Sequence, residues 1–218
     1  MLANQPNLVK VIMEDNVSFF QSHPTAKETL KEVEGLLQDA LKYIGWKELP
    51  EDPSGQYAVN FAVINFIHFV LLPLSCAISF DFLGGNLPAC FMQLRVLIEQ
   101  LAKCFFADLN YQDLNLALDK IEHLEAKGRG ITRMVTKLNP ANETLYKVLS
   151  NDWVHLKHLK PIVKIFERGD VQMLVPVPCS ENELPEIQEL GRAIHIYRFV
   201  LADTLQKWKT RVFSRDSV

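Results

Sequence analysis

The sequence lacks the short motifs by which several enzyme classes are recognised. It contains no GxSxG, HExxH, GxxxxGKS/T or GxGxxG pattern, so the standard hydrolase, zinc protease, P-loop and dinucleotide-binding classes have no support. There is no internal repeat or low-complexity tract. The start at Met1 also lacks the basic region and hydrophobic run of a secretory signal. We therefore expect a cytoplasmic protein outside these classes.

Cysteine is scarce, and no two cysteines form a CxxC pair. The four are Cys76, Cys90, Cys104 and Cys179, and three of them lie in strongly apolar surroundings. Buried free thiols in a reducing compartment are the expected state. A zinc site built from cysteines is not expected, and the sequence suggests no cofactor.

Charge is absent from residues 53–80, which contain no Asp, Glu, Lys or Arg. The apolar segment 61–83 is long enough to cross a bilayer. However, Asn65, His68, Ser75 and Ser79 fall on one helical face. The flanking residues also lack the Lys/Arg excess of a membrane span. We therefore predict a buried helix of a soluble domain, kinked at Pro73 because proline removes a backbone donor.

Helical spacing of apolar residues covers most of the chain. The predicted fold is all-α: one domain, 1–218, formed by a bundle of seven or eight helices with a long buried central helix at about 56–83. Within it we expect an N-terminal helical pair over 1–45, a central bundle over 56–168 and a long C-terminal helix over 184–213. Turn and capping residues predict further helices at 6–22, 112–126, 131–138 and 142–167. Two more helices are predicted to begin at Pro24 and at Asn86. The segment 171–178, VQMLVPVP, reads as extended.

The net charge of −3 conceals a basic middle region. Arg129, Arg133 and Lys137 recur at four-residue steps, and a second basic set follows: Lys157, Lys160 and Lys164. On helices these sets would line single faces and make a groove for a phosphate backbone. The alternative is a solvated charged face, since the pI near 6.1 is not that of a dedicated nucleic-acid binder.

Two charged residues stand in an otherwise apolar helix. Arg95 and Glu99 lie four residues apart within LRVLIEQLAKCFF, so they need each other or partners on another helix. They could form an ion pair that fixes helix register, or part of a polar pocket at the centre of the bundle.

A second polar cluster occupies the segment LYKVLSNDWVHLKHL, with Tyr146, Ser150, Asn151, His155 and His158. The two histidines lie one helical turn apart and could share a metal ion. No fixed carboxylate accompanies them in sequence, so structural or surface histidines remain the alternative.

The order of RVLIE and YKVLSNDWVH resembles uncharacterised prokaryotic helical proteins that look related to the HEPN superfamily, over about residues 90–160. That resemblance implies metal-independent ribonucleases whose signature is an arginine, commonly a polar residue, then a histidine, at a site between two protomers. Here His155 and Asn151 match, but Ser150 stands at the arginine position. A serine cannot supply the cation that would stabilise phosphate charge. Arg95 is the candidate to replace it.

Three functions follow as expectations. The first is a homodimeric module that binds nucleic acid, such as RNA, or a partner protein. Its polar core would contain Arg95, Glu99, Asn151 and His155 together with Asn65, His68, Ser75 and Tyr146. The second is an endoribonuclease with His155 as general acid or base, assisted by Arg95, Glu99 and Asn151. The third is a metal-binding bundle using His155, His158 and either Glu99 or His68. We expect the polar stripe of the uncharged segment to face the helices that carry Arg95, Glu99 and His155.

Overall fold

The computed structural model describes residues 8–52, 54–128, 130–149 and 178–213, and these contain helices and connecting loops but no strand. Eight of the helices have seven or more residues, which confirms the all-α bundle. The elements are α1 Leu8–Ser22, α2 Pro24–Ile44, α3 Tyr57–Asn60, α4 Ala62–Phe66, a π-helical turn Ile67–Leu71, α5 Leu72–Leu83, α6 Leu87–Asn110, α7 Ala117–Ala126, α8 Ile131–Leu138, α9 Ala141–Lys147, a 3₁₀ turn Glu181–Glu183 and α11 Leu184–Phe213.

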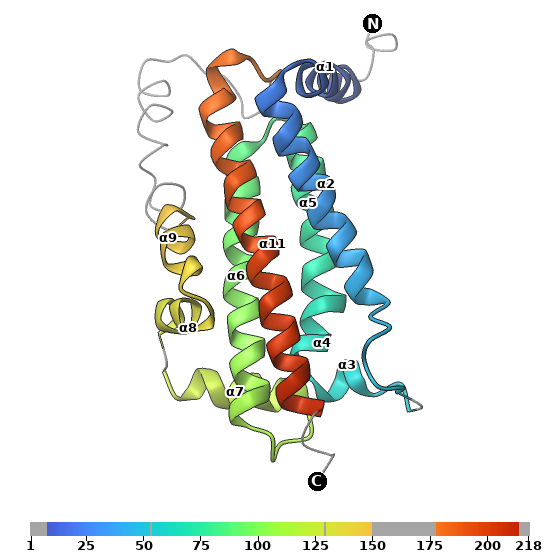
Figure 1. Cartoon of the computed structure of the whole chain (residues 1–218), viewed down its shortest axis with the longest axis vertical. Helices are drawn as coiled ribbons and strands as arrows, with labels where there is room; N and C mark the ends of the chain where they lie inside the picture. The colour runs from blue at the N-terminus through green and yellow to red at the C-terminus, as the bar shows by residue number, and fades with distance from the viewer. Residues whose placement is uncertain (1–7, 53, 129, 150–177, 214–218) are drawn as a thin grey trace, which may run out of the picture.

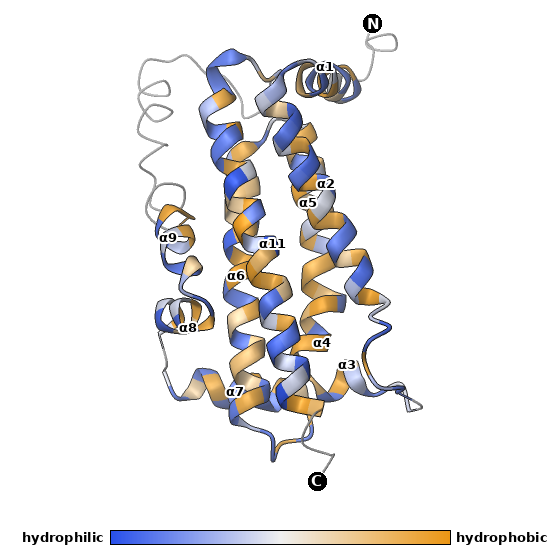
Figure 2. Cartoon of the chain, viewed as in Figure 1, coloured by the Kyte–Doolittle hydropathy of each residue, from blue (hydrophilic) through white to orange (hydrophobic). Residues whose placement is uncertain are grey.

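Four long helices form the body of the bundle. α2 packs against α11 and α5, and α6 packs against the same two helices, so the four close a ring around the core (Figure 1). α1 lies across one end of α2, while α7 and α8 pack on the flank of α6, and α9 packs against α8 and α11. Figure 2 shows α5 coloured hydrophobic over most of its length, whereas α2 carries a hydrophilic side.

Helix boundaries follow the local sequence closely. Pro24 occupies the first turn of α2, where its missing N–H costs nothing. α5 ends before Gly84, and Gly85 takes a left-handed conformation with φ of 75° that favours glycine. The Ser180 side chain and Glu183 form a reciprocal capping box just before α11. α11 then spans 184–213, as predicted.

The uncharged segment forms one side of the bundle and is only partly buried, whereas α6 packs against α4, α5 and α11 on one side and against α7 and α8 on the other. Ala62–Leu83 is the one helix in the described residues long and apolar enough to cross a membrane. Only 39% of its most apolar window is buried, and both Phe69 and Phe80 are 67% exposed. The prediction of a long buried central helix is therefore corrected. α6 has twelve buried residues, because its apolar stripe meets α4, α5 and α11.

Pro73 is accommodated by a widened turn immediately before it. Residues Ile67–Leu71 form a π-helical turn in which the Leu72 N–H donates to the Ile67 carbonyl, five residues back. Proline cannot donate a backbone hydrogen bond, and its ring crowds the carbonyl four residues earlier. A wider turn gives that ring room without ending the helix.

The four cysteines are free thiols, as expected. Cys90 and Cys104 are buried, and burial raises the pKa of both thiols well above the ordinary value. Cys179 is partly buried, and desolvation raises its pKa to about 11. The buried thiols therefore behave as small apolar groups in the core.

Candidate functional site

Arg95 and Glu99 form one polar cluster with Tyr146 between α6 and α9. The Arg95 Nε donates a 2.8 Å hydrogen bond to Glu99 Oε1, and the Tyr146 hydroxyl donates to the same oxygen, also at 2.8 Å. The Arg95 guanidinium also lies 5.6 Å from the centre of the Tyr146 ring. Three residues predicted from sequence are thus brought together around one carboxylate oxygen.

The pairing determines what this cluster can do chemically. Desolvation lowers the pKa of Arg95, but the hydrogen bond and the charge of Glu99 outweigh it, so the pKa is raised overall. Because the cation and carboxylate neutralise each other, neither is a free charge for phosphate or a free base. Arg95 Nη1 is buried without a hydrogen-bond partner among the described residues. The geometry is that of a partly buried ion pair within α6, to which the Tyr146 hydroxyl attaches α9.

The polar stripe of the uncharged segment bonds to its own backbone and not to this cluster. The Asn65 side chain donates to the Ala58 carbonyl at 3.2 Å, and the Ser75 hydroxyl donates to the Leu71 carbonyl at 2.7 Å. His68 is half-buried beside the ring of Phe69. Within the described residues, no hydrogen bond joins this stripe to Arg95 or Glu99. The expected single polar interior site is therefore not assembled by these residues.

Several predicted site residues lie outside the described residues. They are Arg129, Ser150, Asn151, His155, Lys157, His158, Lys160 and Lys164. Among the described residues, no three His, Cys, Asp or Glu side chains are grouped to hold a metal ion. The ribonuclease and metal hypotheses both depend on His155, and both stay predictions.

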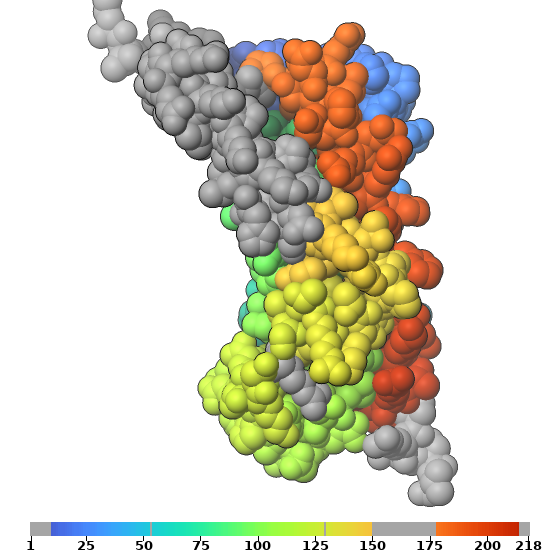
Figure 3. Space-filling model, turned by 90° about the vertical axis from the view of Figure 1, so that its left-hand side faces the viewer, coloured from blue at the N-terminus to red at the C-terminus, as the bar shows by residue number. Residues whose placement is uncertain are grey.

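The basic residues of α8 line a pocket between α8 and the end of α6. This basic pocket has a volume of about 560 Å³. Its lining residues are Phe106, Asn110, Lys127, Gly128, Gly130, Arg133, Met134 and Lys137. Figure 3 faces the flank of the molecule that carries α7, α8 and α9. None of the lining residues is acidic, and three are cationic.

The local backbone explains how the three cations converge. Gly128 follows α7 with φ of 61°, and its N–H donates to the Glu125 carbonyl, which turns the chain back toward α6. α8 then begins at Ile131, and its four-residue step places Arg133 and Lys137 on one exposed face. Lys127 reaches the pocket from the other side, with Nζ 4.9 Å from the Tyr111 ring centre.

The start of α8 adds further hydrogen-bond donors at the pocket. Gly130 occupies the N-cap position and has no side chain to cap the helix. The first backbone N–H groups of a helix have no intrahelical acceptor, and the helix dipole is positive there. Together with the three cations, these groups favour an anion with several oxygens, such as a phosphate.

A buried ionic cluster that sequence reasoning missed lies at the same, C-terminal end of α6. Asp108 accepts hydrogen bonds from the backbone N–H groups of Ala62 at 2.9 Å and Val63 at 3.0 Å, so its carboxylate caps α4. Trp208 Nε1 donates to it at 2.9 Å, and Lys120 Nζ lies 3.4 Å away. Burial raises the pKa of Asp108, against the opposing effect of these donors. Every carboxylate oxygen is occupied, so the cluster is structural.

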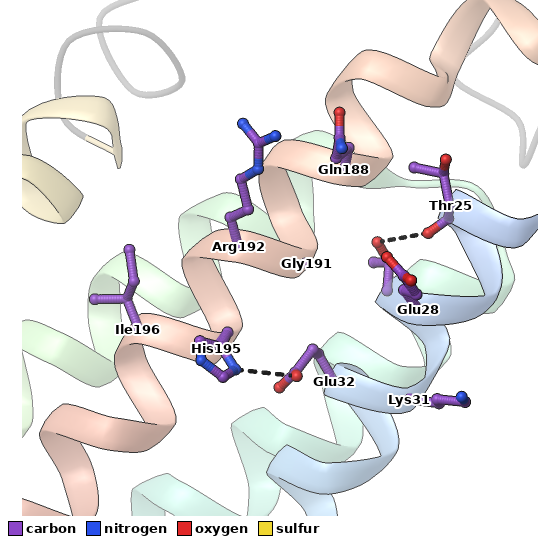
Figure 4. A pocket seen from close by; sticks show the side chains of 10 residues that line it. Thr25, Glu28, Lys31, Glu32, Gln188, Gly191, Arg192, His195 and Ile196 are labelled. Carbon is purple, nitrogen blue, oxygen red and sulfur yellow. Dashed lines mark hydrogen bonds and ion pairs between the residues drawn. The ribbon is translucent and has the colours of Figure 1, made fainter.

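A second pocket opens between α2 and α11. It has a volume of about 450 Å³, and its lining includes Glu28, Glu32, Arg192 and His195 (Figure 4). His195 Nδ1 lies 3.1 Å from Glu32 Oε1, and both side chains also border open solvent. Its charges are of both signs, and His195 with Glu32 joins the two helices, which is typical of a surface groove over a helix contact.

Comparisons with known proteins give no match to any family model, to any curated protein or to any solved structure.

Proposed function

We propose that this chain is a nucleic-acid-binding module that holds the backbone of a single strand in the basic pocket of α6, α7 and α8. The observation that carries this proposal is the convergence of Lys127, Arg133 and Lys137 on one pocket with no acidic lining residue. Lysine and arginine side chains on nucleic-acid-binding proteins replace the counterions condensed on phosphates.

An aromatic ring beside the cations favours a single strand over a duplex. Phe106 is half-buried and lines the same pocket. A base that is free of a double helix can stack on such a ring, which contributes roughly 1–3 kcal/mol per base. The pocket volume of about 560 Å³ is within the range of small-molecule sites, so it suits one nucleotide and its flanking phosphates.

The net charge of the protein limits how much of its surface can bind nucleic acid. With a net charge of −3, the protein as a whole repels a polyanion. Binding therefore depends on the local cations. Three phosphate contacts on a single strand predict that log Kobs falls against log salt with a slope of about −2.

Fluorescence anisotropy with labelled single-stranded RNA and DNA in EDTA tests the proposal. The double variant Arg133→Ala with Lys137→Ala removes two cations, so affinity should fall at least about tenfold and the salt slope should become shallower by about 1.4. Lys147→Ala is the matched control, because Lys147 is an exposed cation on α9 already paired with Glu143 at 2.7 Å. If the double variant binds as tightly as the control, the pocket is not the site.

The same labelled RNA distinguishes binding from cleavage. The HEPN resemblance predicts fragments in EDTA that disappear in a His155→Ala variant. The binding proposal predicts intact RNA in both samples, since Arg95 is already engaged by Glu99. Fragments dependent on His155 would assign the chain to the ribonucleases instead.

A further inference from the structure

The three cations of the basic pocket carry charges that the described residues do not neutralise. Lys127, Arg133 and Lys137 line the pocket together, and none of its lining residues is acidic. Within the part of the chain that the structure describes, none of the three forms an ion pair. By contrast, Lys103 of α6 is paired with Glu125 at 2.8 Å. Three positive charges are therefore available to a ligand in the pocket.

The end of a phosphorylated strand brings about as much negative charge as these cations can balance. A nucleotide inside a strand lies between two phosphodiesters, and together they carry a charge of about −2. A nucleotide at a phosphorylated end lies between one phosphodiester and a phosphate monoester, whose own charge is about −1.5 to −2 at pH 7. The total charge at such an end is therefore closer to that of the three cations.

The surface beside the pocket does not favour a strand that continues in both directions. α7 and the loop before it carry four acidic residues that are exposed or half-buried: Asp113, Asp119, Glu122 and Glu125. The one lysine within α7, Lys120, is buried against Asp108. At physiological ionic strength charges act over about 8 Å, so the carboxylates of this segment repel a nearby phosphate backbone. The favourable charge is confined to the pocket, which suits a strand that ends there.

The pocket receives its aromatic ring and two of its cations from different helices. Phe106 and Asn110 lie one turn apart on α6, and Asn110 Nδ2 donates a 2.7 Å hydrogen bond to the Phe106 carbonyl, which holds the amide against its own helix. Arg133 and Lys137 come from α8. A nucleotide can therefore place its base on the Phe106 ring while its phosphates contact α8.

Gly130 lines the pocket although neither its backbone conformation nor the packing around it requires glycine. Its φ is −57°, which any residue can adopt. A Cβ added at Gly130 would meet no atom within 4 Å. Glycine is common where a backbone must approach a ligand closely. The open space beside Gly130 therefore gives an anion access to the start of α8.

We propose that the basic pocket binds the phosphorylated end of a single strand. The terminal phosphate monoester lies among Lys127, Arg133 and Lys137 beside Gly130, and the first base stacks on Phe106. This assignment rests on the proposed function and narrows its ligand from any stretch of a strand to a strand end. A 5′-phosphate and a 3′-phosphate have the same charge and the same oxygens, so the experiment distinguishes the two ends.

Competition anisotropy in EDTA with three unlabelled RNAs of one sequence tests the proposal. One RNA carries a 5′-phosphate, one a 3′-phosphate and one a hydroxyl at both ends, and each displaces an internally labelled strand that is phosphorylated at both ends. One of the phosphorylated forms should compete at least about tenfold better than the hydroxyl form, because charged hydrogen bonds to the monoester are gained. The form that competes better identifies the end.

The preference for a terminal phosphate should depend on the pocket. It should disappear in the double variant Arg133→Ala with Lys137→Ala and persist in Lys147→Ala, whose cation is exposed on α9 and paired with Glu143. Gly130→Ala changes no charge, and it should reduce the preference at least about threefold because the added methyl group occupies space beside the phosphate. Thermal unfolding by circular dichroism confirms that each variant is folded.

The outcomes separate this proposal from the proposed function. Equal competition by all three RNAs, with affinity that still depends on Arg133 and Lys137, overturns the binding of a strand end and leaves the strand-binding module intact. A preference that survives the double variant places the terminal phosphate outside the pocket and also overturns the proposal. If no RNA binds, the proposed function and this assignment both fail.

Discussion

The indole Nε1 of Trp208 donates a 2.9 Å hydrogen bond to Oδ2 of Asp108, which joins α11 to α6 across 100 residues of sequence. Both side chains are almost completely buried. The same carboxylate caps α4. Lys120 of α7 lies 3.4 Å from Asp108 and also donates a 2.7 Å hydrogen bond to the Asn60 carbonyl. The Asp108 carboxylate of α6 therefore pairs with buried polar groups of three other helices, α4, α7 and α11.

Replacing that carboxylate should destabilise the fold severely. Asp108→Ala leaves Lys120 buried without its counter-charge and leaves two backbone donors of α4 unpaired, so we expect a loss of about 3–5 kcal/mol in the free energy of unfolding. Urea unfolding measures it. Glu143→Ala breaks an exposed ion pair with Lys147 and should cost less than about 1 kcal/mol. Similar losses in the two variants would contradict a structural role for Asp108.

The buried thiols should show both chemical protection and a pH effect. Because burial raises their pKa, Cys90 and Cys104 should resist maleimide at pH 8 until the chain unfolds, as measured by mass spectrometry. Above the unfolded thiol pKa of about 8.5, the native state holds more protons than the unfolded state, so stability falls as pH rises. The decline between about pH 8.5 and pH 10 should be shallower in a Cys90→Ala, Cys104→Ala variant. Equal declines would show that these thiols do not contribute.

Gly191 should resist a change that normally favours helices. Alanine in a helix interior is about 1 kcal/mol better than glycine. At Gly191 of α11, however, a Cβ would lie 2.5 Å from Thr29 Oγ1 and 3.2 Å from Thr29 Cα in α2. We expect Gly191→Ala to lower the free energy of unfolding by about 1–3 kcal/mol, because the two helices must separate.

Gly45→Ala serves as the comparison for Gly191, since a Cβ there meets no atom within 4 Å. Thermal and urea unfolding of the two variants should therefore differ clearly, with Gly45→Ala close to wild type. A stabilised Gly191→Ala protein would show that the contact of α2 with α11 is looser than described.

Tyr146→Phe tests how α9 is attached to α6. It removes the 2.8 Å hydrogen bond to Glu99 but keeps the ring over Arg95, so we expect a loss of about 0.5–1.5 kcal/mol. The ion pair of Arg95 and Glu99 should remain. If Glu99 were instead a catalytic base, Tyr146→Phe would change the rate of RNA cleavage even where the protein stays fully folded. Urea unfolding of the variant and the cleavage assay in EDTA therefore separate the two roles.

Local signals sufficed for most helix boundaries but not for the pairing of buried polar groups. Pro24, Gly84 and Gly85 mark helix ends through backbone chemistry that acts within a few residues, and the structure places the ends there. Arg95 and Glu99 were recognisable as partners because one helical turn joins them. Periodicity could not distinguish a helix buried all round from one with an exposed apolar side, so the position of 62–83 was predicted wrongly.

The Asp108 cluster left a signal that periodicity alone could not interpret. Asp108 continues the buried stripe of Leu101 and Phe105, and Lys120 stands between the buried Ala117 and Leu124. A charge in a core position implies a partner elsewhere. Which residue is the partner depends on how closely α7 and α11 approach the end of α6. Tertiary packing sets those distances, and the sequence does not show them.

The π-helical turn at Ile67–Leu71 amounts to a one-residue insertion in an otherwise regular helix. Deleting a residue there would rotate everything before it by about 100° and move it by about 1.5 Å relative to α5. The N–H groups of Ala62 and Val63 would then turn away from Asp108, or Phe69 would leave the exposed side of the segment. The length of this turn therefore fixes the rotation of α4, which Asp108 caps, relative to α5.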